Sequence, residues 1–105
     1  MNKLVFVVVV VSAWWSFSAK ANDGEALVKK NGCMACHALQ SKMVGPAFKD
    51  IAVKYQGDAN AVAVLSSKVL NGSAGVWGQL PMPPHKGRVT DDQVKAMINY
   101  VLSIQ

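Results

Sequence analysis

The sequence predicts an all-α domain of about four helices. Apolar residues recur at helical spacing in four segments, and no segment after residue 21 alternates apolar and polar residues with a period of two. The chain has 105 residues, so it holds one domain at most. Its two cysteines stand in one short motif, and a proline-rich segment follows in the second half. We therefore expect one small helical domain whose candidate chemistry lies in these two segments.

Residues 1–21 are expected to be a cleaved signal peptide. Lys3 gives the start a positive charge, residues 4–11 form an unbroken apolar run, and the segment closes on Ala19-Lys20-Ala21. This order is typical of an exported chain with an A-x-A cleavage site. An uncleaved membrane anchor is the alternative, but a spanning helix needs about 20 apolar residues and this stretch is shorter. We therefore expect a periplasmic domain over residues 22–105, without stable membrane insertion.

Removing this segment leaves a short chain with few large apolar side chains. Four aromatic residues remain in it: Phe48, Tyr55, Trp77 and Tyr100. A domain of this size has a marginal hydrophobic core, so the composition indicates that a cofactor fills part of it. Nine basic and six acidic side chains remain, with no basic run longer than Lys29-Lys30, which argues against a nucleic-acid-binding protein.

The first two helices are expected on either side of the cysteine motif. The first begins at Asn22 or Asp23, either of which can cap it, and ends near the stop pair Asn31-Gly32. Pro46 suits the first turn of the second helix, and Gly57 ends it. The apolar residues of the second helix have helical spacing: Phe48, Ile51, Ala52 and Tyr55.

The third and fourth helices are expected in the second half of the chain. The third runs from about Asn60 to Leu70, before the stop pair Asn71-Gly72. The fourth has the clearest pattern, because Thr90 and Gln93 form a capping box. Its apolar residues form one stripe along the helix: Val94, Met97, Ile98, Val101 and Leu102. The stripe explains Met97 as a core residue.

The two cysteines form the motif Cys33-Met34-Ala35-Cys36-His37. C-x-x-C-H is the attachment signature of haem c. Two thiols on one turn can each add to one haem vinyl group, and the histidine that follows is directed at the iron. Imidazole is the usual proximal ligand of haem iron. The motif therefore predicts one covalently attached haem, with Cys33 and Cys36 as attachment points and His37 as an axial ligand.

Three alternatives for the cysteine pair are less well supported. A dithiol redox site expects a βαβ context, which the sequence lacks, and it leaves His37 unexplained. A disulfide between Cys33 and Cys36 would close a short loop, and the stabilisation that a disulfide gives grows with loop length. A zinc site lacks a second pair of ligands. Haem attachment is the interpretation that uses all three side chains.

Met82 is the candidate for the second axial ligand, because it lies inside Gly78-Gln79-Leu80-Pro81-Met82-Pro83-Pro84. Proline fixes its own φ and drives the preceding residue to an extended conformation, so the segment is a stiff strap that holds the thioether in place. An ordinary proline-rich surface loop is the alternative. His85 is a rival ligand, although we favour an exposed surface histidine there. Met43 is expected at the haem edge, and Met34 cannot reach the far face of the iron.

Together these segments resemble the small bacterial cytochrome c-551/c-552 family (cytochrome c8 type, class I cytochrome c). The resemblance extends over nearly all of residues 22–105 and implies the small class I cytochrome c fold, with about four helices wrapped around one covalently bound haem c. The segments that carry it are Gly32-Cys33-Met34-Ala35-Cys36-His37, Lys42-Met43-Val44-Gly45-Pro46-Ala47, Asn71-Gly72-Ser73, Gly75-Val76-Trp77-Gly78 and Pro81-Met82-Pro83-Pro84.

The resemblance also implies roles for individual residues. His37 and Met82 are the implied axial ligands, and the Pro46 carbonyl is implied to accept a hydrogen bond from the other ring nitrogen of His37, which fixes the ring. Trp77 is implied to donate its indole N–H to a haem propionate, with Lys68 as the cationic partner. A plain core aromatic is the alternative for Trp77.

The expected function is one-electron transfer. A haem with two axial side-chain ligands has no open position for a substrate, so its iron cycles between Fe(III) and Fe(II). The resemblance implies a periplasmic monomer, not an enzyme, that takes electrons from a cytochrome bc1-type donor and passes them to an oxidase, nitrite reductase or peroxidase. The alternatives are a haem peroxidase or gas sensor with a labile sixth ligand, and a thiol oxidoreductase. One departure bears on this: His85 stands where relatives often carry an asparagine that hydrogen-bonds the ligand sulfur.

Electrons are expected to pass through the haem edge near the surface. Weak, quickly released redox complexes use small patches. We expect an apolar ring there, made of Met34, Ala35, Met43, Leu80, Pro81 and Pro83. Three lysines are expected to steer partners toward this ring: Lys29, Lys42 and Lys86.

Overall fold

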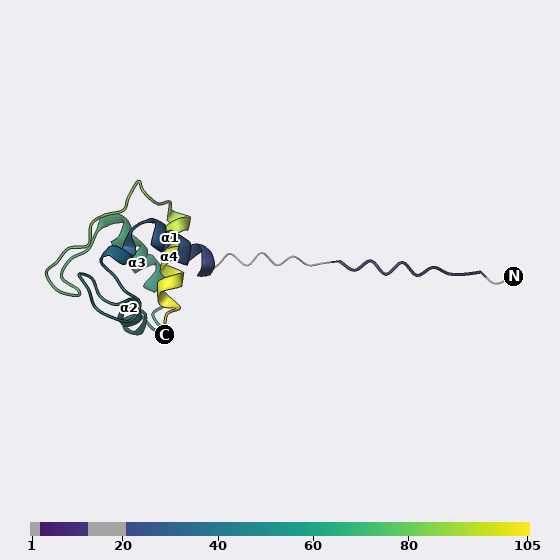
Figure 1. Ribbon diagram of the computed structural model, residues 1–105, viewed down its shortest axis with the longest axis horizontal. Helices are drawn as coiled ribbons and strands as arrows, with labels where there is room; N and C mark the ends of the chain where they lie inside the picture. The colour runs from purple at the N-terminus through teal and green to yellow at the C-terminus, as the bar shows by residue number, and fades with distance from the viewer. Residues whose placement is uncertain (1–2, 13–20) are drawn as a thin grey trace.

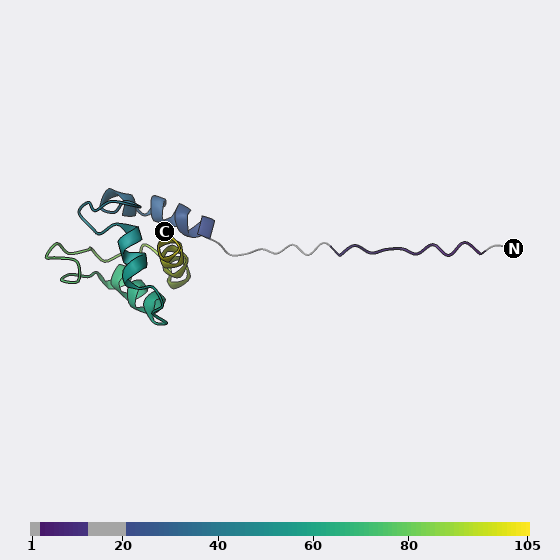
Figure 2. The same cartoon turned by 90° about the horizontal axis from the view of Figure 1, so that it is seen from below.

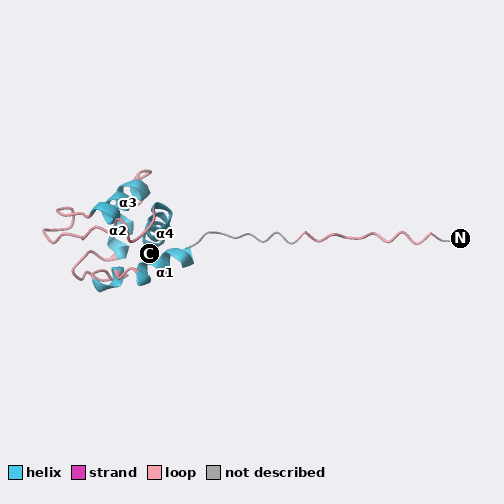
Figure 3. Cartoon of the chain, turned by 90° about the horizontal axis from the view of Figure 1, so that it is seen from above, coloured by secondary structure: helices cyan, strands magenta, loops and turns pink. Residues whose placement is uncertain are grey.

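The computed structural model describes residues 3–12 and 21–105. The helical elements within them are α1 (Ala21–Lys30), the 3₁₀ turn η1 (Cys33–Ala35), α2 (Phe48–Lys54), α3 (Ala61–Asn71) and α4 (Asp91–Leu102). In this part of the chain there is no strand, only isolated bridges between Ser73 and Met82 and between Lys86 and Val89. Figure 3 shows the helices joined by long loops. The predicted all-α class is confirmed.

The first and last helices pack against each other and form the most extensive contact between elements (Figure 1). Gly24 allows this close approach, because a Cβ atom there would meet the carbonyl oxygen of Ala96 and lie 2.8 Å from Cβ of Tyr100. Helix α4 also packs against α2 and α3, so it is the central element of the domain.

Helix α4 begins as the sequence predicts. The Oγ1 of Thr90 accepts a hydrogen bond from the backbone N–H of Gln93 (3.1 Å), and the Oε1 of Gln93 accepts one from the N–H of Thr90 (2.9 Å). This capping box satisfies two backbone donors at the helix start. The buried face of α4 is Val94, Met97, Ile98 and Val101. The other three helices complete the core with Val28, Phe48, Leu65 and Val69.

Helix α2 begins two residues later than Pro46, and the prediction that Pro46 lies in its first turn is wrong. Ala47 is the N-cap and is extended, with φ −60° and ψ 142°. The carbonyl of Pro46 accepts a hydrogen bond from the His37 ring, while the N–H of Asp50 bonds the carbonyl of Ala47. The carbonyl of Pro46, which would accept a backbone hydrogen bond if the helix began there, is thus bonded to the side chain of His37.

The predicted signal peptide stays a prediction. Its cleavage-site residues Ala19 and Lys20 lie outside the described residues, and α1 begins at Ala21. The apolar side chains of residues 4–11 are exposed. Among residues 3–12 and 21–105, no helix combines the length and apolar character needed to cross a membrane.

Candidate haem site

A cavity of about 300 Å³ opens between the helices and two loops, residues 36–47 and 72–84. This volume is in the range of small-molecule and cofactor pockets. Its walls are mainly apolar, and each α-helix contributes to them. The helical apolar residues that line it are Val28, Phe48, Ile51, Leu65, Val69, Met97, Ile98 and Val101. Met97 is thus a core residue, as predicted, and a wall of the cavity as well.

Cys33, Cys36 and His37 all line this cavity. A tight turn brings them together: the N–H groups of Cys36 and His37 both donate to the carbonyl of Cys33, at 3.2 and 2.9 Å. Gly32 precedes the turn with φ 74°, a left-handed conformation that glycine adopts without steric cost. Both thiols are free and half-buried. The local backbone therefore points the three side chains of the motif at one wall.

The Cys33 thiol does not have the character of a reactive redox cysteine. Burial raises the pKa of the Cys33 thiol above its ordinary value of 9.0. Catalytic and redox-active cysteines instead have a lowered pKa, since the thiolate is the reactive form. The dithiol alternative therefore gains no support from this environment.

His37 is buried and its ring orientation is fixed. Its ring stacks on Phe48, with centroids 5.0 Å apart and planes 24° apart. Its Nδ1 lies 2.7 Å from the carbonyl oxygen of Pro46. A carbonyl only accepts, so Nδ1 donates and Nε2 keeps its lone pair for a metal ion. The hydrogen bond that the family resemblance implies is present.

Gly45 is a residue of this site whose role sequence reasoning missed. A Cβ atom there would lie 2.5 Å from Cε1 of His37, so the ring occupies the space that a side chain would need. The N–H of Gly45 also donates to the carbonyl of Cys36 at 2.7 Å. Gly45 thus closes the loop tightly over the imidazole. The sequence signal was the glycine before Pro46 in one of the family segments. The reason why a glycine is needed there is visible only in the fold.

Met82 lines the same cavity from the other loop. Its backbone pairs with Ser73: the N–H of Met82 donates to the carbonyl of Ser73 (2.7 Å), and the reverse bond is 3.1 Å. The paired backbones set where the half-buried thioether enters the site. His37 and Met82 therefore line one cavity from two separate loops.

His85 is buried, so the exposed surface histidine expected there is wrong. Its side chain is 6% exposed. Its Nδ1 donates to the carbonyl of Pro83 (3.0 Å), and its backbone N–H donates to the carbonyl of Val69 at the end of α3 (2.9 Å). It is not part of the cavity lining, so the geometry does not support it as a rival ligand either. The chain after the strap folds back on α3 and covers the imidazole.

Trp77 and Lys68 both line the cavity. Trp77 is 41% exposed, so it is not the plain core aromatic that was the alternative. The Nζ of Lys68 lies 3.5 Å from Oγ of Ser73, at the base of the loop that carries Trp77. A second lysine, Lys54, has its Nζ 5.8 Å from the centroid of the Trp77 ring. The sequence pattern gave no indication of this contact.

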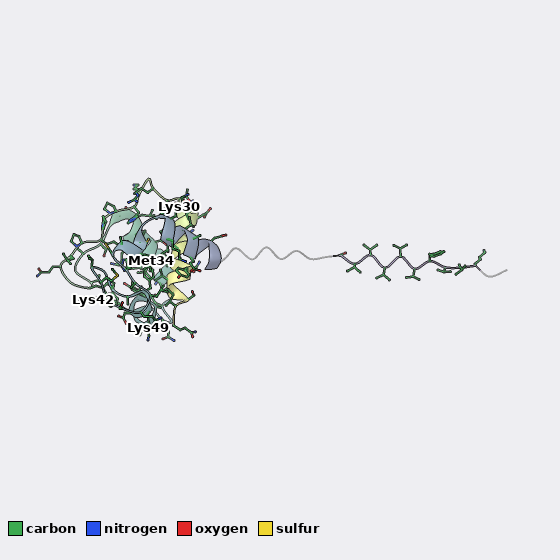
Figure 4. All side chains as sticks on the ribbon, in the orientation of Figure 1. Lys30, Met34, Lys42 and Lys49 are labelled. Atoms are coloured by element: carbon green, nitrogen blue, oxygen red, sulfur yellow. The ribbon has the colours of Figure 1, made fainter. Side chains whose placement is uncertain are left out.

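The expected apolar ring is present in part. Met43, Leu80, Pro81 and Pro83 line the cavity, whereas Met34 and Ala35 do not. Figure 4 shows the side chains on the ribbon and labels Met34.

The three lysines expected to steer partners differ in their surroundings. Lys42 lines the cavity. Lys86 is exposed and is not among the residues that line the cavity. Lys29 forms a 2.9 Å ion pair with Glu25, whose hydrogen bond raises the pKa of Lys29. The charge of Lys29 is therefore partly compensated.

These residues fit a covalently held haem. An apolar cavity suits the porphyrin faces, two thiols lie on one wall, and an imidazole with a free Nε2 and a thioether supply the ligand types of a haem with His and Met coordination. Trp77 and Lys68 offer polar groups for a propionate at the rim.

The comparisons with known proteins agree with this site. The Cytochrome c family model matches residues 21–105. Cytochrome c-551 of Pseudomonas aeruginosa is 52% identical over 85 residues, which cover 81% of this chain and 80% of that protein. Cytochrome c-552 of Hydrogenobacter thermophilus is 45% identical over 105 residues, the whole of both chains. The crystal structure of wild type Nitrosomonas europaea cytochrome c552 matches with a TM-score of 0.73 and 47% identity, over 77% of this chain and 99% of that one. The chain therefore belongs to the cytochrome c family, whose members bind one covalently attached haem c.

Proposed function

We propose that the protein is a periplasmic monohaem cytochrome that carries single electrons and has no catalytic activity of its own. Cys33 and Cys36 would hold the haem through thioether bonds, and His37 and Met82 would supply its two iron ligands. The observation that carries this proposal is that the imidazole and the thioether line one apolar cavity from two separate loops. With both axial positions taken, a substrate has no place on the iron.

The bound haem supplies the one-electron chemistry, and the protein keeps its environment constant. The Pro46 carbonyl holds the His37 ring in one tautomer and orientation. The Ser73 pairing holds Met82, whose thioether is a weak ligand that benefits from a fixed position. Apolar walls exclude water, which favours the less charged Fe(II) state. Ligation by Met and His also raises the potential relative to harder ligands.

A periplasmic location is supported at the start of the chain. The Cytochrome c family model begins to match at residue 21, where the predicted signal peptide ends. The relative from Hydrogenobacter thermophilus aligns over all 105 residues and therefore also over this segment. We accordingly assign residues 1–21 to a cleaved signal peptide and residues 22–105 to the cytochrome domain.

Partners would dock at the open rim of the cavity. Met43, Leu80 and Pro81 are exposed there, and Lys42 adds positive charge. Such a patch suits a brief encounter with an acidic surface of a redox protein. The expected donor is a bc1-type cytochrome complex, and the expected acceptors are an oxidase, a nitrite reductase or a peroxidase.

The test is the optical spectrum of the exported protein, oxidised and reduced, before and after denaturation in alkaline pyridine. We expect a c-type haemochrome with one haem per chain and the weak far-red band of a sulfur ligand on Fe(III). A Met82→Ala variant should lose that band while it keeps the haemochrome. A haemochrome without the band would overturn the ligand set and favour an open iron, and the absence of covalent haem would overturn the whole proposal.

A further inference from the structure

The loop that carries Trp77 has few connections to the rest of the domain. Residues 74–81 are all exposed, and Figure 2 shows this loop, which follows α3, extending outward from the helices. Within the described residues, the one backbone hydrogen bond inside this stretch is internal, from the N–H of Gly75 to the carbonyl of Gly78 (2.9 Å). The base of the loop is fastened by the Ser73 pairing with Met82, but that pairing does not reach the tip.

The composition of the loop makes an additional connection necessary if Trp77 is to keep one orientation. Gly72, Gly75 and Gly78 all have positive φ, at 83°, 89° and 124°. Glycine lowers the cost of such turns, but it also leaves the free loop many other conformations. Trp77 is nevertheless the loop residue with the largest apolar ring, and it lines the cavity while 41% of its surface stays exposed.

Lys54 supplies a connection at the tip. Its Nζ lies 5.8 Å from the Trp77 ring centroid and 5.9 Å from that of Tyr55, within the range of cation–π attraction. Tyr55 is half-buried and packs against the hydrophobic core, so this end of the contact is fixed to the body of the domain. Lys54 is the last residue of α2. The ammonium therefore joins the rigid end of a helix to the ring at the tip of the loop.

We propose that Lys54 is a positioning residue for Trp77: it ties the tip of the 74–81 loop to the end of α2 and so fixes the indole at the rim of the cavity. Lys68 fastens the base of the loop through Ser73, and Lys54 fastens its tip. Any effect of this positioning on a haem propionate rests on the proposed function. The fastening of the loop by Lys54 does not depend on it.

The test compares three variants of the haem-loaded protein by hydrogen exchange of the Gly75 amide, whose N–H donates to the carbonyl of Gly78 within the loop. Lys54→Gln removes the charge, Lys54→Arg keeps it, and Lys49→Gln removes a charge from the exposed side of the same helix. We expect exchange about two- to fivefold faster in Lys54→Gln, a change that corresponds to the loss of an exposed cation–π contact. Exchange should be unchanged in Lys54→Arg and in Lys49→Gln. The indole N–H of Trp77 should also exchange faster in Lys54→Gln alone.

Equal exchange in Lys54→Gln and Lys49→Gln would overturn the proposal. So would a lower reduction potential in Lys54→Gln with unchanged loop exchange, since Lys54 would then act through its charge alone. A normal c-type spectrum in all three variants keeps either result separate from the proposed function, which fails only if covalent haem or methionine ligation is missing in the parent protein.

Discussion

The loop that carries His37 and the loop that carries Met82 line the same cavity but are held in different ways. In the His37 loop, residues 36–47, backbone bonds recur along its length: Gly45 to Cys36 (2.7 Å), Met43 to Gly45 (3.0 Å) and Phe48 to Ala38 (2.9 Å). In the Met82 loop, residues 72–84, the Ser73–Met82 pair closes the base of the loop, and the bond to the rest of the domain comes from His85 to Val69, just beyond its end. One loop is supported throughout, and the other is supported mainly where it begins and ends.

This difference matches the strengths of the two proposed ligands. Imidazole binds haem iron firmly, and its loop is the more rigid one. A thioether is the weaker ligand, and its position depends on a stiff strap whose ends are fastened at Ser73 and, through His85, at Val69. Disturbances of the domain should therefore reach the methionine side first. The following experiments test that order.

The largest effect is expected from removal of both attachment points. The double variant Cys33→Ala, Cys36→Ala should stay largely unfolded without haem, because the core residues that line the 300 Å³ cavity then lack their filling. Far-UV circular dichroism during thermal or urea unfolding would show a weak signal and no cooperative transition. A native-like cooperative helical signal would contradict this, and it would mean that the two loops organise themselves without the cofactor.

The next effect is on the histidine side. Gly45→Ala should lower the free energy of unfolding by about 1–3 kcal/mol, the usual cost of overpacking. The added Cβ would lie 2.5 Å from Cε1 of His37, and Phe48 behind the ring leaves it little room to move. Guanidinium unfolding of the haem-loaded protein measures the change, and the methionine band should persist until the global transition. Unchanged stability would show that the His37 loop is less rigid than its hydrogen bonds indicate.

A smaller effect on stability is expected from the matching change on the methionine side. Gly72 has φ 83°, and an added Cβ would lie 2.9 Å from the carbonyl oxygen of Met82. Gly72→Ala should cost about 1–2 kcal/mol, because φ 83° with ψ 166° is a conformation that essentially only glycine adopts, and it should disturb the pairing that positions Met82. The far-red band should then disappear on heating well before the protein unfolds.

Gly57→Ala is the control for this prediction. Gly57 has a similar φ of 76°, and nothing lies within 4 Å of an added Cβ. It should show the backbone cost without early loss of the band. If both variants lose the band at the same temperature, Gly72 has no special connection with Met82.

The smallest effect on the fold is expected from charge reversal at the rim. Lys42→Glu with Lys86→Glu should slow electron transfer to an acidic redox protein roughly tenfold at low ionic strength, because electrostatic steering is lost, and the difference should vanish at high salt. Stopped-flow kinetics against salt concentration measures this, with Lys95→Glu on α4 as the control. An equal rate at low salt would remove both lysines from the docking face.

Features with local causes were predictable from the sequence, and features that depend on distant partners were not. The start of α4 follows from Thr90 and Gln93, which lie within one turn of each other. The start of α2 did not follow, because it depends on a carbonyl that Pro46 gives to His37. The family motifs identified residues that line the cavity, because these segments have a recognisable sequence.

Burial and long-range contacts account for what was missed. His85 was expected at the surface because Met82, held by the prolines, was the better ligand candidate, but its burial is set by the chain folding back on α3. The sequence gave no indication of a role for Lys54, because its partner Trp77 lies in a loop beyond α3 in the sequence. No local sequence pattern indicates the burial of His85 or the contact between Lys54 and Trp77.

The packing of α1 on α4 has a consequence for how the chain matures. The most extensive contact in the domain joins its two ends, so it cannot form until the last helix has left the ribosome. Contacts of such long sequence separation also delay folding once synthesis is complete. A chain that leaves the ribosome with its N-terminus first thus remains open until its last helix follows. Throughout that interval the segment that contains Cys33 and Cys36 stays open, and the contact between the terminal helices closes the domain last.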